Sequence, residues 1–131
     1  MPGEPPAPNT PGLIGWNELY ATDWQKAFDF YSALFGWTKG EAINMGDMGT
    51  YQLFDHNGRS IGGMMNKPPQ MPVTSWVYYF NVADIDAAVS RVNANGGKIV
   101  NGPMQVPGGG WIAQAVDPQG AFFALVGMRK G

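Results

Sequence analysis

The first amphipathic pattern in the chain lies at residues 24–35. Apolar side chains recur there at three- and four-residue steps, as expected for a helix that packs one face against a core. Thr22 or Asp23 can cap its start, and Gly36 can adopt the left-handed conformation that ends a helix. The pattern predicts a short helix of about three to four turns.

A second helical pattern occupies residues 85–92. Asp84 is its natural N-cap, and Gly96 with Gly97 closes it. Eight short runs rich in β-branched and aromatic residues surround the two helices, and turn residues separate them. These candidate strands are 13–20, 39–45, 50–54, 60–65, 75–82, 98–100, 111–116 and 121–126. Each half of the chain therefore has the order strand, helix, strand, strand, strand.

The two halves also match at individual positions, which indicates an internal repeat. Asp23 and Asp84 are 61 residues apart, and Gln52 and Gln114 are 62 apart. A loop one residue longer would explain the change of offset. We therefore predict an α+β fold built from two tandem βαβββ modules.

The predicted boundaries follow from proline and glycine. The modules are expected at 13–66 and 73–128, and a stiff connector with three prolines joins them into a single domain of 13–128. Residues 1–12 contain five prolines and no apolar period, so we expect a disordered tail there.

Composition removes several classes of function. The chain has 131 residues, a net charge of -2 and no cysteine. Basic residues are scattered, which argues against a nucleic-acid partner, and disulfides and thiolate chemistry are excluded. The sequence shows neither a membrane-spanning stretch nor a secretory signal, so no membrane partner is expected and a cytoplasmic location is the default.

Three sequence motifs carry a family resemblance. They are WNELYATD at 16–23, FYSALFGW at 30–37 and DPQG at 117–120. With the tandem modules, they make the chain resemble the vicinal oxygen chelate superfamily, which includes glyoxalase I, bleomycin-resistance proteins and extradiol dioxygenases. The resemblance implies that the modules form a curved, cup-shaped mixed sheet with helices outside. It also implies a divalent metal at the base of the cup.

The resemblance places metal ligands on the first and last strand of each module. The corresponding positions here are Trp16, Gly62, Val77 and Ala124. Divalent ions need imidazole, carboxylate or amide ligands, and none of these side chains provides one. We therefore expect no metal site and no cofactor, although a divalent metal held by displaced ligands stays open.

Glu18 is the candidate catalytic residue. On a strand it shares a face with Trp16 and Tyr20, so it should enter the cup beside aromatic surface. A desolvated carboxylate can serve as a general acid or base. Alternatively, it accepts hydrogen bonds from neighbouring donors and only lines the cup.

Two glutamines are candidate polar contacts for a ligand. Gln52 and Gln114 occupy matching positions in the two halves and could face each other across the cup. The parity of their strands leaves an outward-facing position equally open.

The predicted ligand site is rich in aromatic residues and methionine, which favours a flat or apolar organic ligand. Its full set is Trp16, Glu18, Gln52, Met64, Tyr79, Trp111, Gln114 and Phe122. Trp111 follows a glycine-rich segment at 107–110 that is either a flap over the cup or an ordinary hairpin connection. A dimer interface that covers the apolar surface is the alternative. His56, the only histidine, is expected in a surface turn.

The leading hypothesis is a glyoxalase-like protein that binds a small organic molecule without a catalytic metal. The alternative is a metal-dependent lyase, isomerase or dioxygenase, of lactoylglutathione-lyase or dioxygenase type, with metal held by Glu18 and Gln52 or Gln114. A purely structural protein is a third class, because a fold alone implies no activity. A homodimer is favoured, since open sheet edges need cover.

Overall fold

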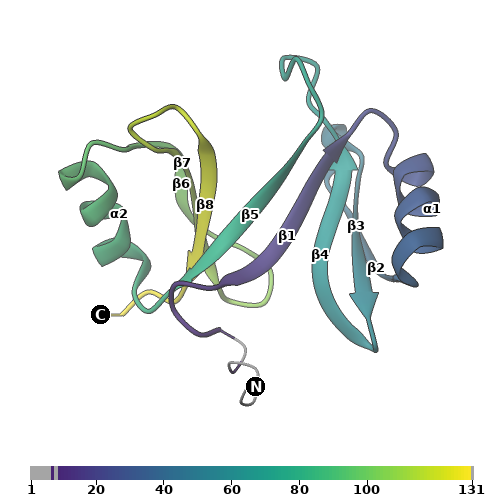
Figure 1. Cartoon of the computed structure of the whole chain (residues 1–131), viewed down its shortest axis with the longest axis horizontal. Helices are drawn as coiled ribbons and strands as arrows, with labels where there is room; N and C mark the ends of the chain where they lie inside the picture. The colour runs from purple at the N-terminus through teal and green to yellow at the C-terminus, as the bar shows by residue number, and fades with distance from the viewer. Residues whose placement is uncertain (1–6, 8, 131) are drawn as a thin grey trace. The chain divides into compact units, whose positions relative to one another are not determined.

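The computed structural model describes residue 7 and residues 9–130, which form eight strands, two α-helices and one 3-10 turn (Figure 1). Most of the predicted tail, residues 1–6 and 8, lies outside the described residues. The chain divides into two compact units. The first module is Trp16–Val77, and the second module is Tyr78 onward together with the segment that ends at Gly15. The α+β class and the βαβββ order of each module are confirmed.

The first module is a four-stranded sheet in the order β2-β3-β4-β1, with α1 along one face (Figure 1). Its elements are β1 (Ile14–Ala21), α1 (Trp24–Phe35), β2 (Thr38–Asn44), η1 (Gly46–Met48), β3 (Thr50–His56) and β4 (Arg59–Asn66). β1 and β4 are parallel, whereas β2, β3 and β4 pair antiparallel. The first three residues of β5 also belong to this module.

The predicted caps of α1 are confirmed. The Asp23 carboxylate accepts from the amides of Gln25 and Lys26, and Gly36 ends the helix at φ 72°. Such a cap satisfies amides that the first helical turn leaves without partners.

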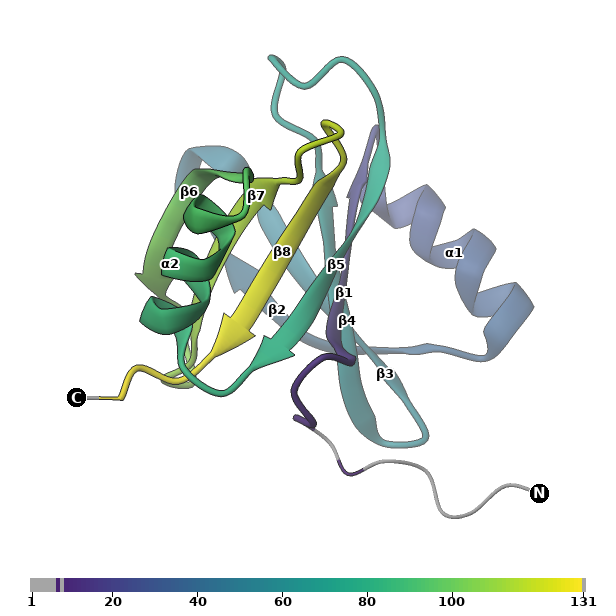
Figure 2. The same cartoon turned by 60° about the vertical axis from the view of Figure 1, so that its left-hand side comes forward.

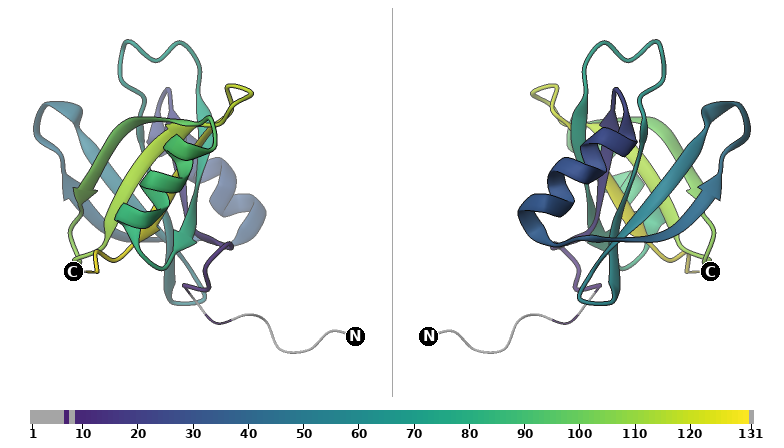
Figure 3. Two further views of the ribbon diagram at one scale, coloured as in Figure 1. Left: turned by 90° about the vertical axis from the view of Figure 1, so that its left-hand side faces the viewer. Right: turned by 90° about the vertical axis from the view of Figure 1, so that its right-hand side faces the viewer.

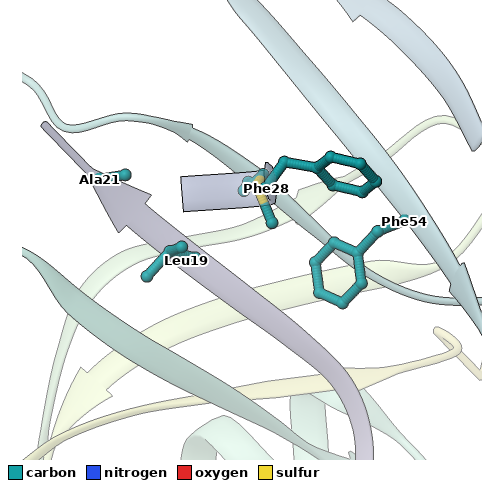
Figure 4. Packing of buried hydrophobic residues seen from close by; sticks show 5 residues of the cluster. Leu19, Ala21, Phe28 and Phe54 are labelled. Atoms are coloured by element: carbon teal, nitrogen blue, oxygen red, sulfur yellow. The ribbon is translucent and has the colours of Figure 1, made fainter. Parts of the chain in front are cut away.

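The core of the first module lies between α1 and the sheet (Figure 4). It consists of Leu19, Ala21, Phe28, Phe54 and Met64, with Trp24, Trp37 and Trp76 among the side chains packed around it. Leu19 and Ala21 are two residues apart on β1 and therefore point to the same face. This alternation sends Trp16, Glu18 and Tyr20 to the other face.

The second module repeats the arrangement with the order β5-β8-β7-β6. Its elements are β5 (Ser75–Val82), α2 (Ile85–Ala94), β6 (Lys98–Gln105), β7 (Trp111–Val116) and β8 (Phe122–Gly127). α2 begins at the predicted N-cap Asp84 and crosses one face of β8, β7 and β6 (Figure 2). Figure 3 shows this helix face and, in its other view, α1 on the first module. β6 extends beyond the predicted strand, with one register shift at Val100 and a second between Asn101 and Met104, where Gly102 and Pro103 lie.

The register shows how the two modules correspond. In the first, Glu18 and Leu53 both pair with Gly63 of β4. In the second, Tyr79 and Gln114 both pair with Ala124 of β8. Glu18, Leu53 and Gly63 are therefore equivalent to Tyr79, Gln114 and Ala124, at one constant offset of 61 residues.

The predicted match of Gln52 with Gln114 is wrong by one residue. The register shift between Phe54 and Asp55 leaves Ile61 as an extra residue in β4. The β7–β8 turn is longer than the β3–β4 turn, and the bulge in β4 brings the two modules back into alignment after it. The offset of 62 seen near the turns consequently returns to 61 at the centre of the strands.

The end of the predicted tail is held against the second module, which the sequence did not predict. Gly12 N donates to Asn81 O, and Asn81 N donates to Leu13 O, both at 2.8 Å. The buried Asn81 side chain also donates from Nδ2 to Thr10 O at 3.3 Å. These three bonds fix residues 10–13 alongside β5.

Candidate functional site

A chain of three side chains crosses the face of the first module opposite α1. Trp16 Nε1 donates to the Tyr51 hydroxyl at 2.9 Å, and that hydroxyl donates to Glu18 Oε2 at 2.8 Å. Glu18 is only 7% exposed. A buried carboxylate needs such donors because its desolvation is costly. We call Trp16, Tyr51 and Glu18 the relay.

Strand geometry brings the relay together. Trp16 and Glu18 are two residues apart on β1, so their side chains share a face, as the sequence predicted. Tyr51 reaches them from β3 across β4, where Gly63 has no side chain in the way. A Cβ on Gly63 would overlap Cε2 and Cζ of the Tyr51 ring and lie 2.5 Å from its hydroxyl.

The second module carries a different polar chain at the equivalent place. Gln114 Nε2 donates to the Tyr79 hydroxyl at 2.9 Å, and Gln114 Oε1 accepts from Asn101 Nδ2 at 3.2 Å. Tyr79 is 2% exposed and Gln114 is 9% exposed. Both ends of the Gln114 amide are therefore engaged, which fixes its orientation.

The residues present do not fit the divalent metal that the resemblance implies. Bulging of β4 moves the last-strand position of the first module from Gly62 to Gly63, and glycine offers no donor in either case. Trp16, Val77 and Ala124 provide no metal-binding atom either. In the described part of the chain, no group of three or more His, Cys, Asp or Glu could hold a metal ion.

Gln52 and Met64 lie on the helix side of the first module, not on the relay face. Gln52 pairs with Met64, which is fully buried in the core beside Phe54. Gln52 Nε2 donates to the carbonyls of Gly40, Glu41 and Leu53 at 2.9 to 3.3 Å. The first two carbonyls lie at the register shift of β2. Gln52 and Met64 thus point to the helix-side core, where Gln52 donates to the carbonyls at the bulge, and contact of either residue with a ligand stays a prediction.

Trp111 is also on a helix face. It packs on the cluster of Ile85 and Ala88 beneath α2, and the guanidinium carbon of Arg129 lies 3.8 Å from its ring centroid. The prediction that Trp111 lines the cup is therefore wrong. Parity explains the error, because Trp111 alternates with Gln114 and shares its side with the buried Ala113.

Arg129 ties the end of the chain to α2. Its Nε and Nη2 donate to the two carboxylate oxygens of Asp86 at 2.7 and 2.9 Å. These hydrogen bonds to Asp86 raise the pKa of Arg129 above its ordinary value; desolvation opposes the rise, and the negative charges of Asp86 and Asp84 add to it. The contact is an exposed ion pair beside the first turn of α2.

The remaining predicted residues keep the expected face or turn. Phe122 is 46% exposed and, by alternation, lies on the face of Ala124 and Gln114. His56 is exposed at the β3–β4 turn, as predicted. The glycine-rich segment at 107–110 is a hairpin connection closed by a bond from Val106 N to Gly110 O.

Sequence reasoning missed Tyr51 and Asn101. The signal for Tyr51 was available, since a core position at Phe54 places the residue three before it on the opposite face of a strand. Glycines at 62 and 63 also indicate a close approach of a bulky group. Asn101 follows a register shift, which no alternation rule locates.

A family model for the Glyoxalase/Bleomycin resistance protein/Dioxygenase superfamily matches residues 13–125. The chain belongs to this superfamily. The resemblance drawn from the motifs is thereby confirmed.

Two curated relatives are similar over nearly the whole chain. The anthracycline biosynthesis protein DnrV of Streptomyces peucetius is 35% identical over 136 residues, which cover 92% of this chain and 48% of DnrV. CFP32 of Mycobacterium bovis is 31% identical over 118 residues, covering 90% of this chain and 45% of CFP32. The chain thus spans about half the length of these relatives.

A solved structure shares the fold. Methylmalonyl-CoA epimerase from Mycobacterium tuberculosis aligns with a TM-score of 0.67 over 91% of each chain, at 16% identity. Similarity at this level shows the fold alone. Within the described residues, no helix is long and apolar enough to cross a membrane.

Proposed function

We propose that this protein binds a small aromatic or apolar organic molecule on the relay face of the first module, without a catalytic metal. The observation that carries the proposal is the relay itself. An indole, a phenol and a carboxylate occupy the face where the superfamily resemblance expects metal ligands. Such side chains suit stacking and hydrogen bonding to an organic ligand.

The side chains of the relay suggest how a ligand would be held. Trp16 is partly exposed, so part of its indole remains available for stacking. Its Nε1 is already committed to Tyr51, which fixes the ring plane. Glu18 supplies a carboxylate that can accept from a ligand hydroxyl or amide. A flat ligand with one hydrogen-bond donor matches this combination.

The name of one relative supports the same ligand class. DnrV is named as an anthracycline biosynthesis protein, and anthracyclines contain a flat fused-ring core. We therefore choose a hydroxylated anthraquinone as the probe. The choice of probe rests on the name of DnrV, and this chain spans only about half of that protein.

Tryptophan fluorescence tests the proposed face. Titration of 1,8-dihydroxyanthraquinone into chelator-treated protein should quench emission saturably, and Trp16→Ala should weaken binding at least tenfold. Trp24→Ala is the control, since Trp24 lies on α1 and packs on the helix-side core. Melting curves of both variants establish that each is folded. Equal affinity losses at the two sites would contradict the proposal.

A second candidate function is acid–base catalysis by Glu18, favoured by its burial and its bond to Tyr51. Glu18→Gln distinguishes the two. For a binding protein, the substitution should weaken ligand binding by about 1 to 2 kcal/mol. For an enzyme, it should preserve binding and lower turnover roughly a hundredfold or more. Hemithioacetals, catechols and α-keto acids are the substrates to screen, with and without added divalent metal.

We also propose a homodimer formed through α1. Phe30, Leu34 and Phe35 on this helix are 59%, 57% and 52% exposed, which is unusual for large apolar side chains. Sedimentation equilibrium should give a dimer, and Phe30→Glu with Leu34→Glu should give a monomer. A monomeric wild-type protein would contradict this proposal.

A further inference from the structure

A cavity of about 670 Å³ lies in the second module, on the opposite side of the sheet from Tyr79 and Gln114. Its floor is apolar and comes from β5 and β8 through Phe80, Val82, Phe123 and Leu125. These side chains belong to the cluster that faces α2. The volume falls within the range of small-molecule sites, and the cavity is wide open to solvent, so a bound ligand stays partly exposed.

The rim of the cavity carries the guanidinium group of Arg91. Arg91 lines the cavity from the last turn of α2, and it makes no ion pair with any carboxylate in the described residues. Asp117 is the other charged group at the rim. Its Oδ1 accepts from the amides of Gln119 and Ala121, so that oxygen is committed to the β7–β8 turn.

The segment before β1 forms a wall of the cavity. Pro11 and Gly12 line the cavity, and the bonds of Gly12 and Thr10 to Asn81 hold this segment in place. Pro11 has a fixed φ and no amide proton, so it presents an apolar surface. The buried Asn81 thus anchors this wall through hydrogen bonds.

We propose that this cavity is a second binding site that accepts an aromatic carboxylate. The ring lies against Phe80 and Phe123, and the carboxylate pairs with the guanidinium of Arg91. A planar carboxylate fits the paired N–H groups of arginine better than it fits a point charge. The proposal is independent of the proposed function, which concerns the first module.

NMR titration with 2-naphthoate tests the site. The methyl resonances of Val82 and Leu125 should shift saturably, whereas those of Leu19 in the first module should not. The neutral 2-naphthylmethanol has the same ring system and should bind at least tenfold more weakly. Shifts confined to the first module, or no saturable shift, would overturn the proposal.

Two variants define the role of Arg91. Arg91→Gln should weaken 2-naphthoate binding about tenfold and leave 2-naphthylmethanol binding unchanged, because only the ion pair is lost. Arg59→Gln removes an exposed arginine of β4 and should change neither. Unchanged naphthoate binding in Arg91→Gln would refute the ion pair. Trp16→Ala should leave the naphthoate shifts intact, which separates this site from the relay face.

Discussion

The ring of Tyr51 occupies the space that a side chain at Gly63 would fill. A Cβ on Gly63 would overlap two ring carbons and lie 2.5 Å from the Tyr51 hydroxyl. This close approach lets Tyr51 reach Glu18 across β4. The phenol ring of Tyr51, which extends from β3, thus occupies the space beside Gly63 on β4, the last strand of the module, where glycine has no side chain.

Gly63→Ala should destabilise the protein by about 1 to 3 kcal/mol, because the ring must move or the strand must shift. Gly110→Ala is the matched control, since a Cβ there meets only Val106 at 4.0 Å. Urea unfolding measures the free energy of unfolding of both variants. Combining Gly63→Ala with Tyr51→Ala should cost less than the sum of the single changes. Additive losses would show that the two positions do not interact.

Tyr51→Phe keeps the ring and removes the hydroxyl that joins Trp16 to Glu18. The free energy of unfolding should fall by about 1 to 3 kcal/mol, because buried polar groups lose a partner. Tyr78→Phe, which alters an exposed tyrosine on β5, should change it little. A similar small effect for both variants in urea unfolding would mean that the relay contributes nothing to stability.

Gln52→Leu should lower stability by about 1 to 3 kcal/mol and leave anthraquinone affinity unchanged. The reason is that the Gln52 amide serves the carbonyls of the β2 bulge on the helix side. Gln105→Leu, at an exposed position of β6, is the control for loss of a glutamine. A drop in affinity for the folded Gln52→Leu protein would restore Gln52 to the ligand site.

Arg129→Gln should lower the melting temperature slightly and shift the indole resonance of Trp111, because the bonds to Asp86 and the stacking on Trp111 are both lost. The pKa of Arg129 is raised in the folded protein. Its contribution to stability is therefore complete below the pKa of the unfolded state and is lost only as the pH rises through the pKa of the folded state. For arginine both values lie far above neutrality. The difference in melting temperature should therefore be constant from about pH 7 to pH 10, and a loss of that difference within the range would contradict the assignment.

The fold was largely predictable because local signals agreed with one another. Asp23 and Asp84 were expected as caps and act as caps, and Gly36 ends α1 in the left-handed conformation. Alternation in β1 placed Glu18 and Trp16 on one face, as observed. Periodicity succeeds here because the strands have one core side and one opposite side.

The site was less predictable because it depends on register. A single bulge at Ile61 moved the relevant position from Gly62 to Gly63 and removed Gln52 from its match with Gln114. Each one-residue slip reverses the face of every following side chain. No local pattern reveals such a bulge, because it results from pairing between distant strands. The error at Trp111 has a different origin, because Trp111 and Gln114 are three residues apart on a regular strand and alternation alone puts them on opposite faces.

Calorimetric titration of metal-free protein with 1,8-dihydroxyanthraquinone tests the central claim most directly. The protein is stripped with chelator, its metal content is measured, and half of it is then reloaded with zinc, manganese or iron. We predict saturable binding to the stripped protein with the same affinity in every sample, because Trp16, Tyr51 and Glu18 act without a metal. Binding that appears only after a stoichiometric metal is restored would contradict the account.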